Sequence, residues 1–329
     1  MKYSIEFLQG QIEKDLLSLY DFEENFAVSL LKYSENIIYK VAFKTAEPVV
    51  FRIHRLGYHT ERELESELIW MNEIARDTDI SLPVIYAGRD GRFLQKLVLP
   101  DGTVFNCSVI SFLYGKAVGE LKGERLIAKM RDIGEMTAKL HLQSINRDNS
   151  VRLERPHWDC ESFFGENAVW GHWQEYSLLT ESDRVLFSKC ETLIKQKLAH
   201  YGKARDRYGI IHADMHFFNI ITDGEKDQLI DFDDCGWGYY LYDLGCSLVT
   251  YSAALPELTA AWLEGYEKIR KLSDGDKKML PLFLLLRRIV RLAWLSSHAD
   301  SDTAKTVEAD YLEATRELGE KFLAENKVD

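Results

Sequence analysis

Apolar residues near the N-terminus recur at helical spacing, and the pattern then changes to that of strands. Residues 3–20 place apolar side chains three or four positions apart, which predicts a short amphipathic helix. Short segments rich in β-branched and aromatic residues follow, and polar turns separate them. We expect strands at residues 26–33, 37–43 and 49–53. The chain is therefore predicted to start with one helix and a set of antiparallel strands.

A second helix and three further strands complete this part of the chain. Residues 62–76 carry apolar residues at helical spacing and acidic residues early, where they favour the helix dipole. We expect the further strands around residues 82–87, 93–97 and 104–113. Antiparallel strands around a single helix form a small α+β lobe.

The pattern becomes mainly helical after Gly115. We expect helices at residues 118–142 and 181–201, and about three more after Pro256. The stretch between the first two, residues 146–178, is irregular and rich in aromatic residues. This half of the chain is therefore predicted to be larger and mainly helical.

The boundary between the two lobes is placed between Leu113 and Gly119. A chain of 329 residues is near the practical limit of one hydrophobic core, which favours two lobes. Its 46% hydrophobic and 29% charged residues exclude wholesale disorder. The predicted divisions are an N-terminal helix at 1–20, an N-lobe at 21–113 and a C-lobe at 114–329.

Charge and cysteine content narrow the class of function. The chain has 41 Lys and Arg against 53 Asp and Glu, a net charge of −12, which argues against binding of nucleic acid. Five scattered cysteines without a C-x-x-C pair predict reduced thiols in the cytoplasm, not disulfides or a zinc site. The N-terminus lacks the apolar core of a signal peptide. The most apolar segment, residues 279–295, is interrupted by arginines and is expected to be a buried helix, not a membrane span.

Candidate chemistry is concentrated between residues 208 and 234. An apolar run ends at His212 and Asp214, and Asn219 follows the aspartate five positions later. A second apolar run delivers Asp231. Carboxylate and amide oxygens suit a hard cation such as Mg²⁺, and a carboxylate beside it could deprotonate a hydroxyl nucleophile. The Asp-x-x-x-x-Asn spacing is that of kinase catalytic loops, which predicts Asp214 as the base and Asn219 and Asp231 as metal ligands.

The run from His212 to Asn219, with Asp231-Phe232-Asp233 after it, resembles the aminoglycoside phosphotransferase and choline kinase superfamily, whose fold is protein-kinase-like. Residues 233–245 are similar to that family's segment before an Asp-Leu-Ala helix start. The resemblance extends over residues 33–294 and looks closest to the bacterial stress-response kinase and homoserine-kinase-like branch. It implies an ATP- and Mg²⁺-dependent phosphotransferase with ATP bound between the lobes.

The resemblance also implies how the N-lobe holds the nucleotide. Ser34 and Asn36 belong to the turn over the phosphates. Arg52 stands on the strand where many members have a phosphate-binding lysine, and Lys40 and His54 are alternatives. Arginine is a forked, permanently charged donor and not equivalent to lysine, but it still neutralises phosphates.

A charge partner for that arginine is expected on the helix after it. Glu67 is the predicted partner, and Glu63 and Glu65 stay open as alternatives because the register could differ. By its place in the chain, the segment that ends the N-lobe would hold adenine through backbone groups near Ser111 and Leu113.

Four further residues near the motif also receive expected roles. Asp233 could contact metal or water in addition to Asp231, and Asp243 is expected to anchor the backbone of the catalytic loop. His212 is expected to be structural. His216 could point into the site, but we favour an exposed position in the loop.

The acceptor site is less defined by the sequence. Residues 156–164 and 169–176 concentrate aromatic and acidic side chains, which could form a pocket wall or, as we favour, a hydrophobic cluster that holds a long insertion. Four basic residues on the last apolar helix could bind an anionic group of a substrate. The alternative, which we favour, is that they pair with carboxylates of the chain. The four residues are Arg287, Arg288, Arg291 and His298.

We therefore expect a kinase that moves the γ-phosphoryl group of ATP to a hydroxyl of a small molecule. An aminoglycoside, an amino alcohol, an amino acid or a sugar would serve as acceptor. The alternatives are a Ser/Thr protein kinase of the stress-response type and a non-catalytic nucleotide-binding scaffold. GTP in place of ATP stays open. We expect a monomer or homodimer that binds neither nucleic acid nor membrane.

Overall fold

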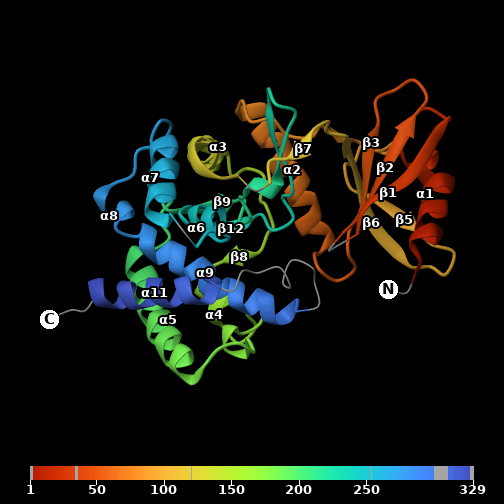
Figure 1. Ribbon diagram of the computed structural model, residues 1–329. Helices are drawn as coiled ribbons and strands as arrows, with labels where there is room; N and C mark the ends of the chain where they lie inside the picture. The colour runs from red at the N-terminus through yellow and green to blue at the C-terminus, as the bar shows by residue number, and fades with distance from the viewer. Residues whose placement is uncertain (1–2, 34–35, 120, 253, 300–309, 327–329) are drawn as a thin grey trace. The chain divides into compact units, whose positions relative to one another are not determined.

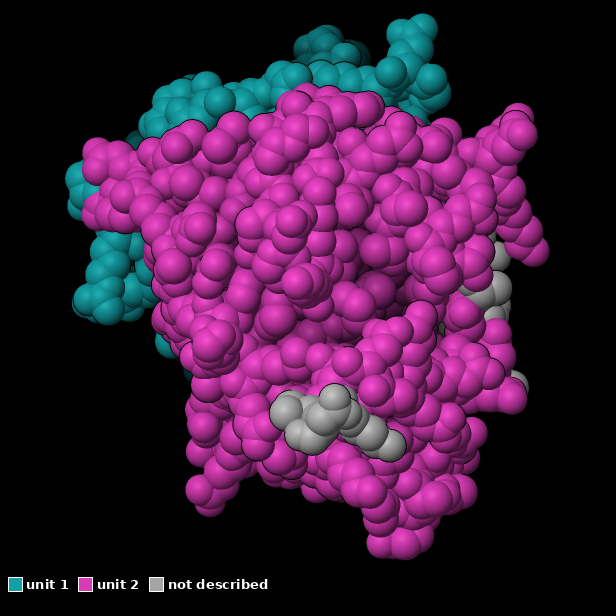
Figure 2. All heavy atoms as spheres, turned by 90° about the vertical axis from the view of Figure 1, so that its left-hand side faces the viewer, with its two compact units in different colours: residues 1–117, 150–155, 220–230 teal, residues 118–149, 156–219, 231–329 magenta. Residues whose placement is uncertain are grey.

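The computed structural model describes residues 3–33, 36–119, 121–252, 254–299 and 310–326. The chain forms two compact units, which Figure 2 colours separately. The first unit combines residues 1–117 with 150–155 and 220–230, and the second combines 118–149, 156–219 and 231–329. Each unit is therefore assembled from separate stretches of chain.

Among the described residues, the first unit is built on an antiparallel sheet (Figure 1). The strands lie in the order β1-β2-β3-β6-β4, and β5 also pairs with β6. Their bounds are β1 Phe26–Tyr33, β2 Ile37–Phe43, β3 Val49–Ile53, β4 Ile85–Tyr86, β5 Gln95–Val98 and β6 Val104–Ser111. The first three match the predicted strands at both ends, because runs of β-branched and aromatic residues bounded by polar turns favour strands.

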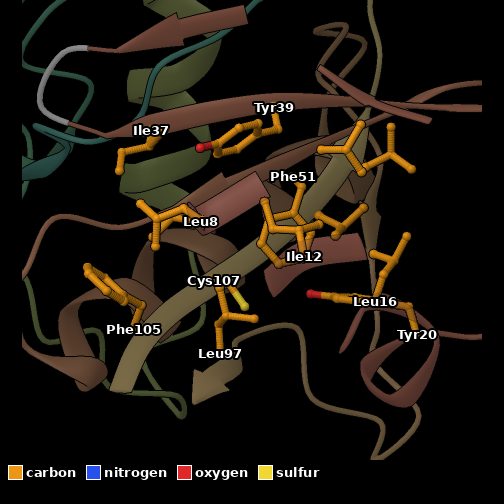
Figure 3. Packing of buried hydrophobic residues seen from close by; sticks show 14 of the residues in the cluster. Leu8, Ile12, Leu16, Tyr20, Ile37, Tyr39, Phe51, Leu97, Phe105 and Cys107 are labelled. Carbon is orange, nitrogen blue, oxygen red and sulfur yellow. The ribbon is translucent and has the colours of Figure 1, made fainter. Parts of the chain in front are cut away.

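Helix α1 (Ile5–Leu19) packs on this sheet and belongs to the first unit (Figure 3). Its apolar stripe is buried as the spacing predicts. The buried residues at this interface include Leu8, Ile12, Leu16, Tyr39 and Phe51. The Tyr39 hydroxyl also donates a hydrogen bond of 2.8 Å to the Ile5 carbonyl. Burial of each such aliphatic side chain contributes about 1.5–3 kcal/mol, so the helix is an integral part of the core.

Helix α2 (Glu61–Asp77) carries one charged residue on its buried face. The helix begins at Thr60, whose side chain forms a capping box with Glu63. Leu64 and Leu68 are buried as expected for an amphipathic helix, and between them Glu67 is also fully buried. A buried carboxylate requires a cationic partner, and for Glu67 that partner is Arg52.

A small second sheet explains why the first unit takes in a later part of the chain. Strands β10 (Ile220–Thr222) and β11 (Asp227–Leu229) form a hairpin, and β10 pairs with β7 (Lys116–Ala117). The Leu229 N–H also donates to the Ser81 carbonyl at 2.9 Å. The structure therefore differs from the predicted continuous C-lobe at 114–329, because backbone pairing joins residues 220–230 to the first unit.

The second unit is mainly helical, as expected. Its longer helices are α3 Gly123–Asn146, α5 Glu181–Tyr201, α7 Leu255–Tyr266, α9 Leu280–Ser297 and α11 Asp310–Glu325. Its shorter helices are α4 Cys160–Phe164, α6 Tyr242–Leu248 and α8 Asp274–Lys277, with 3₁₀ turns at Trp173–Glu175 and Phe217–Asn219. Helix α5 matches the prediction at both ends, whereas α3 begins at Gly123 and not at residue 118.

A three-stranded sheet in the second unit positions the candidate site. Its order is β8 (His157–Trp158), β12 (Gly236–Tyr239) and β9 (Tyr208–Ile211). The chain leaves β9 directly into the predicted catalytic loop, and it leaves β12 into α6. In Figure 1 these two strands lie beside α6.

Helix α9 is the predicted buried helix and carries two arginines in its interior. Arg287 and Arg288 are only 6% and 1% exposed. The helix approaches α6 closely at Gly245, where an added Cβ would lie 2.6 Å from the Phe283 carbonyl oxygen. No helix within the described ranges is long and apolar enough to cross a bilayer.

Candidate active site

The loop after β9 is held through its backbone by Asp243, in the first turn of α6. The buried carboxylate accepts the His212 N–H at 3.2 Å and the Ala213 N–H at 2.8 Å. Ala213 has a φ of 64°, in the left-handed region that residues other than glycine rarely occupy. Local strain of this kind is kept where the surroundings enforce it, and here Asp243 supplies the enforcing hydrogen bonds. This is the anchoring role expected for Asp243.

A chain of buried hydrogen bonds lies behind Asp243. Its carboxylate is 3.1 Å from His141 Nε2, and His141 Nδ1 is 2.8 Å from the Tyr266 hydroxyl. Arg270 donates to that hydroxyl at 2.6 Å. Burial lowers the pKa of His141, although Asp243 opposes the shift, so the ring is neutral at pH 7. The Tyr266 hydroxyl therefore donates to Nδ1, and Nε2–H donates to Asp243.

The sequence analysis missed His141, Tyr266 and Arg270, which support Asp243. Their one sequence signal is His141 on the apolar face of α3, a position at which a histidine needs partners.

Asp214 supplies the carboxylate of the loop, and its side chain is 25% exposed. Its Oδ2 accepts a hydrogen bond of 2.9 Å from Asn219 Nδ2 and lies 3.1 Å from His216 Nε2. Its Oδ1 lies 3.6 Å from Arg287 Nη2. Burial raises the pKa of Asp214, but His216, Arg287 and His212 outweigh it and hold the pKa well below its ordinary value. The carboxylate is thus ionised at neutral pH.

His216 differs from the expectation of an exposed loop residue. Its side chain is only 22% exposed, and its ring turns to the Asp214 carboxylate. The sequence could not show this, because the direction of a loop side chain depends on contacts that the loop makes after folding. His212 is structural as expected: it is fully buried, its ring lies 4.7 Å from that of Phe232, and its Nδ1 accepts the Asp214 N–H at 3.3 Å.

Asn219 is oriented by the same aspartate. Besides Oδ2, its Nδ2 donates to the Asp214 carbonyl at 3.0 Å. Both interactions use the amide nitrogen, so the amide oxygen is the atom left for a cation. The predicted base and one predicted metal ligand therefore lie in direct contact.

The acidic segment after β11 adds further carboxylates. Asp231 is exposed and has a left-handed φ of 64°, whereas Asp233 is 7% exposed. Burial and the nearby charges of Asp214 and Asp233 raise the pKa of Asp234 well above its ordinary value. The negative charge at this place would be relieved by a bound cation, and oxygen donors of this kind fit Mg²⁺.

The first unit holds a separate ion pair between two of the predicted residues. Arg52 Nη1 lies 2.5 Å from Glu67 Oε1, and the glutamate side chain is fully buried. Arg155 Nη1 lies 4.0 Å from the other glutamate oxygen. Of the alternatives, Glu65 pairs with Arg92.

The alternatives to Arg52 have other contacts. Glu63, the remaining alternative to Glu67, caps its own helix through Thr60. The Lys40 ammonium lies 4.2 Å from the centroid of the Phe112 ring. Burial lowers the pKa of His54 well below its ordinary value, with Arg52 adding to the shift, so this ring is neutral and offers no charge to a phosphate.

The remaining N-lobe predictions have mixed outcomes. Ser34 lies outside the described residues. The Asn36 side chain accepts the Arg55 N–H at 3.2 Å, and it therefore braces the start of β2. The Ser111 N–H donates to the Val84 carbonyl at 2.8 Å, so this amide is already used within the unit. No described contact tests Leu113.

The aromatic insertion is packed, as we favoured. Trp158, Phe163 and Trp173 are 2–3% exposed, and Trp158 and Phe163 both contact the ring of Tyr242. Trp170 is also buried, but its ring lies 4.8 Å from the Arg287 guanidinium carbon. The cluster thus reaches the residue that faces Asp214.

Comparison with known proteins identifies the family. The model of the APH phosphotransferase enzyme family matches residues 34–281. The chain belongs to this family. The resemblance stated from the motif is confirmed, and so are the α+β, protein-kinase-like fold class and the activity: this family member transfers a phosphoryl group from ATP to a hydroxyl of a small molecule.

Three similar proteins illustrate the range of the family. A solved microcompartment-associated aminopropanol kinase is 32% identical, with a TM-score of 0.83 over 95% of this chain and 97% of the other. A solved amicoumacin kinase, in complex with AMP-PNP, Ca²⁺ and Ami, is 20% identical, with a TM-score of 0.72 over 97% and 96%. Homoserine kinase of Agrobacterium fabrum is 27% identical over 248 residues, 72% of this chain and 71% of that protein.

Proposed function

We propose that the acceptor of this kinase is a short amino alcohol such as aminopropanol. The observation that carries the proposal is the 32% identity to an aminopropanol kinase over 95% of this chain. The carboxylates near Asp214 support it, because an ammonium group beside the reacting hydroxyl would be attracted to them.

Asp214 would act as the base in this reaction. The acceptor hydroxyl donates a hydrogen bond to the ionised carboxylate, and its oxygen attacks the γ-phosphorus of ATP. As the new O–P bond forms, the bond from the γ-phosphorus to the β,γ-bridging oxygen breaks, ADP leaves, and the hydroxyl proton passes to Asp214. The left-handed turn at Ala213 and the Asp243 hydrogen bonds fix the carboxylate for this step.

The metal would be Mg²⁺, held by the amide oxygen of Asn219 and by Asp231 and Asp233. Within the described ranges no three His, Cys, Asp or Glu side chains converge on one metal position. The proposed donors are therefore only two carboxylates and one amide oxygen. This small set fits Mg²⁺, which proteins hold with one or two carboxylates while nucleotide phosphates complete the coordination. When bound, the metal neutralises charge on the transferring phosphoryl group.

In the first unit, Arg52 would neutralise the nucleotide phosphates. Glu67 fixes its direction through the buried ion pair, which leaves the planar guanidinium pre-oriented. Ser34 and Asn36 are proposed for the turn over the phosphates, and the backbone near Ser111 and Leu113 for adenine. We also propose that the reaction takes place in the cytoplasm, where ATP is available.

An acceptor screen tests the proposal. Purified protein is incubated with ATP and Mg²⁺ and with 1-amino-2-propanol, ethanolamine, homoserine, spectinomycin or casein, and the mass gain of one phosphoryl group is measured. We expect 1-amino-2-propanol to give the highest kcat/KM, by about tenfold or more over homoserine. A higher kcat/KM for homoserine or spectinomycin, or label on casein, would overturn the assignment. A parallel series with GTP tests nucleotide choice.

A further inference from the structure

Arg287 is a buried cation beside the proposed base, and its surroundings satisfy it only in part. Its guanidinium carbon lies 4.8 Å from the Trp170 ring centroid and 5.9 Å from that of Tyr242. Nε donates to Cys246 Sγ at 3.3 Å, and Nη1 is buried without a hydrogen bond to any described residue. Aromatic faces and a thiol are weaker partners than the water that this charge has left.

The Asp214 carboxylate lies within ion-pair distance of Arg287, with 3.6 Å between Oδ1 and Nη2. A buried arginine with so few hydrogen bonds lowers the stability of the fold, because the desolvation of the ion is not fully offset. The position of the charge beside the base thus calls for a functional explanation.

The two oxygens of Asp214 have different surroundings. Oδ2 accepts from Asn219 and lies beside His216, whereas within the described residues Oδ1 accepts no hydrogen bond. The distance of 3.6 Å from Oδ1 to Arg287 Nη2 is too long for a hydrogen bond but well within electrostatic attraction. Arg287 therefore attracts Oδ1 without occupying the lone pair that a proton needs.

We propose that Arg287 is a positioning residue for the base: it holds the Asp214 carboxylate so that Oδ1 accepts the proton of the acceptor hydroxyl. The inference rests on the proposed role of Asp214. In the step, the acceptor O–H bond breaks, the proton binds Oδ1, and the acceptor oxygen forms its bond to the γ-phosphorus as ADP leaves.

The packing of α9 against α6 holds Arg287 in this position. An added Cβ at Gly245 would lie 2.8 Å from the Arg287 Cβ, so only glycine allows the helices to approach this closely. Cys246, the next residue, accepts from Arg287 and donates to the Ala213 carbonyl at 2.9 Å. The same thiol thus links the arginine to the strained residue before Asp214.

Two variants of Arg287 and a matched control test the role. Arg287→Met removes the charge, and Arg287→Lys keeps it without the planar fork. Arg291→Met is the control, because Arg291 lies one turn further along α9 and its Nη1 donates to the Val249 carbonyl at 3.2 Å. We expect Arg287→Met to lower kcat for 1-amino-2-propanol about 100-fold with KM for the acceptor unchanged, since misplaced catalytic groups cost about this much. Arg287→Lys should recover part of the loss, and Arg291→Met should stay near wild type.

Chemical rescue separates positioning from folding. Guanidinium chloride at millimolar concentration should restore part of kcat in Arg287→Ala, because the ion can enter the space left by the side chain, and it should not do so in Asp214→Ala. Thermal melting reports whether each variant is folded. If Arg287→Met does not fold, Trp170→Leu, which removes only the stacked ring, should lower kcat by a smaller factor with KM unchanged.

Several outcomes would overturn the inference. A raised KM with kcat retained would mean that Arg287 binds the acceptor, and equal losses in the Arg287 and Arg291 variants would mean a general charge effect. The absence of rescue, both by lysine and by guanidinium, would mean a structural role. Each variant is also assayed for ATP hydrolysis without acceptor, where water is the nucleophile. If the wild type fails to phosphorylate 1-amino-2-propanol but this hydrolysis depends on Arg287, the proposed acceptor is wrong and the role of Arg287 stands.

Discussion

Each unit contains a buried arginine paired with a carboxylate, and the two pairs differ in closeness. In the first unit, Arg52 and Glu67 are 2.5 Å apart and the glutamate is fully buried. In the second, Arg287 and Asp214 are 3.6 Å apart and the aspartate is 25% exposed. A carboxylate in a tight, dry pair is committed to its partner, whereas a loosely held and partly exposed one keeps a lone pair for chemistry. The distance between the two charged groups therefore distinguishes a pair that orients a side chain from a pair whose carboxylate can react.

The largest expected effect is on the loose pair. Asp214→Ala should lower phosphoryl transfer by about 10³-fold or more, because the variant lacks the carboxylate that is proposed to accept the proton of the acceptor hydroxyl. Binding of ATP, measured by calorimetry with Mg²⁺, should persist. The thermal midpoint is also expected to fall, because the variant leaves the buried Arg287 without the carboxylate 3.6 Å away. Retained activity in this variant would contradict the assignment of the base.

A different loss is expected at Asp231, in the same unit. Asp231→Ala should remove the Mg²⁺-dependent part of ATP binding, because this carboxylate is a proposed metal ligand. Calorimetric titration of ATP with Mg²⁺ and with EDTA measures that part directly. Equal Mg²⁺ dependence in the variant and the wild type would show that Asp231 does not hold the metal.

Loss of the tight pair between Arg52 and Glu67 is expected to affect mainly the stability of the fold. Glu67→Ala leaves Arg52 without the carboxylate at 2.5 Å and should lower the free energy of unfolding by about 3–5 kcal/mol. Urea unfolding measures this loss, and KM for ATP should rise. Glu65→Ala is the matched control on the same helix: its partner Arg92 is 48% exposed, so the expected change is below about 1 kcal/mol. Equal losses in both variants would contradict the distinction.

A third ion pair, between Arg316 and Asp183, is expected to make the free energy of unfolding depend on pH. Arg316 donates to Asp183 at 2.5 and 3.0 Å, and these hydrogen bonds lower the pKa of Asp183 from 3.8 to about 2 in the folded chain. Because the unfolded chain binds this proton more readily, acid favours unfolding. The pair should contribute about 2 kcal/mol above pH 4, lost as the pH falls toward 2.

Urea unfolding at pH 5 and pH 2.5 measures this contribution. Asp183→Asn should remove that part of the acid sensitivity. Glu325→Gln on α11 is the control, since Glu325 is 52% exposed at 3.7 Å from Lys321 and should have no measurable effect. Unchanged acid sensitivity in Asp183→Asn would contradict the prediction.

Sequence alone predicted the local features well. Strands β1 to β3 and helix α5 match at both ends, because hydrophobic period and turn residues are encoded within each segment. The Asp-x-x-x-x-Asn spacing likewise brought Asp214 and Asn219 into contact, since both lie in one short loop. Local spacing was sufficient wherever the partners are close in the chain.

Contacts between segments that are distant in the chain could not be predicted from the sequence. The choice among Glu63, Glu65 and Glu67 depends on how α2 rotates against the sheet, which spacing leaves open. The approach of Arg287 to Asp214 depends on two helices that meet at a glycine. The favoured exposure of His216 was wrong for a different reason: its ring turns to Asp214 in the same loop, and the composition of a loop does not fix the direction of its side chains.

The discontinuity of the first unit bears on how the protein emerges from the ribosome. Strand β7 is made early, but its partner β10 is synthesised about a hundred residues later, and Leu229 is synthesised about 150 residues after Ser81, whose carbonyl it binds. A nascent chain that ends at residue 117 thus has the large sheet but exposes unpaired backbone at two places. We expect this unit to reach its full protease resistance only after residue 230 has left the exit tunnel. Vectorial synthesis would therefore delay the completion of the N-terminal unit until much of the catalytic loop's unit is already made.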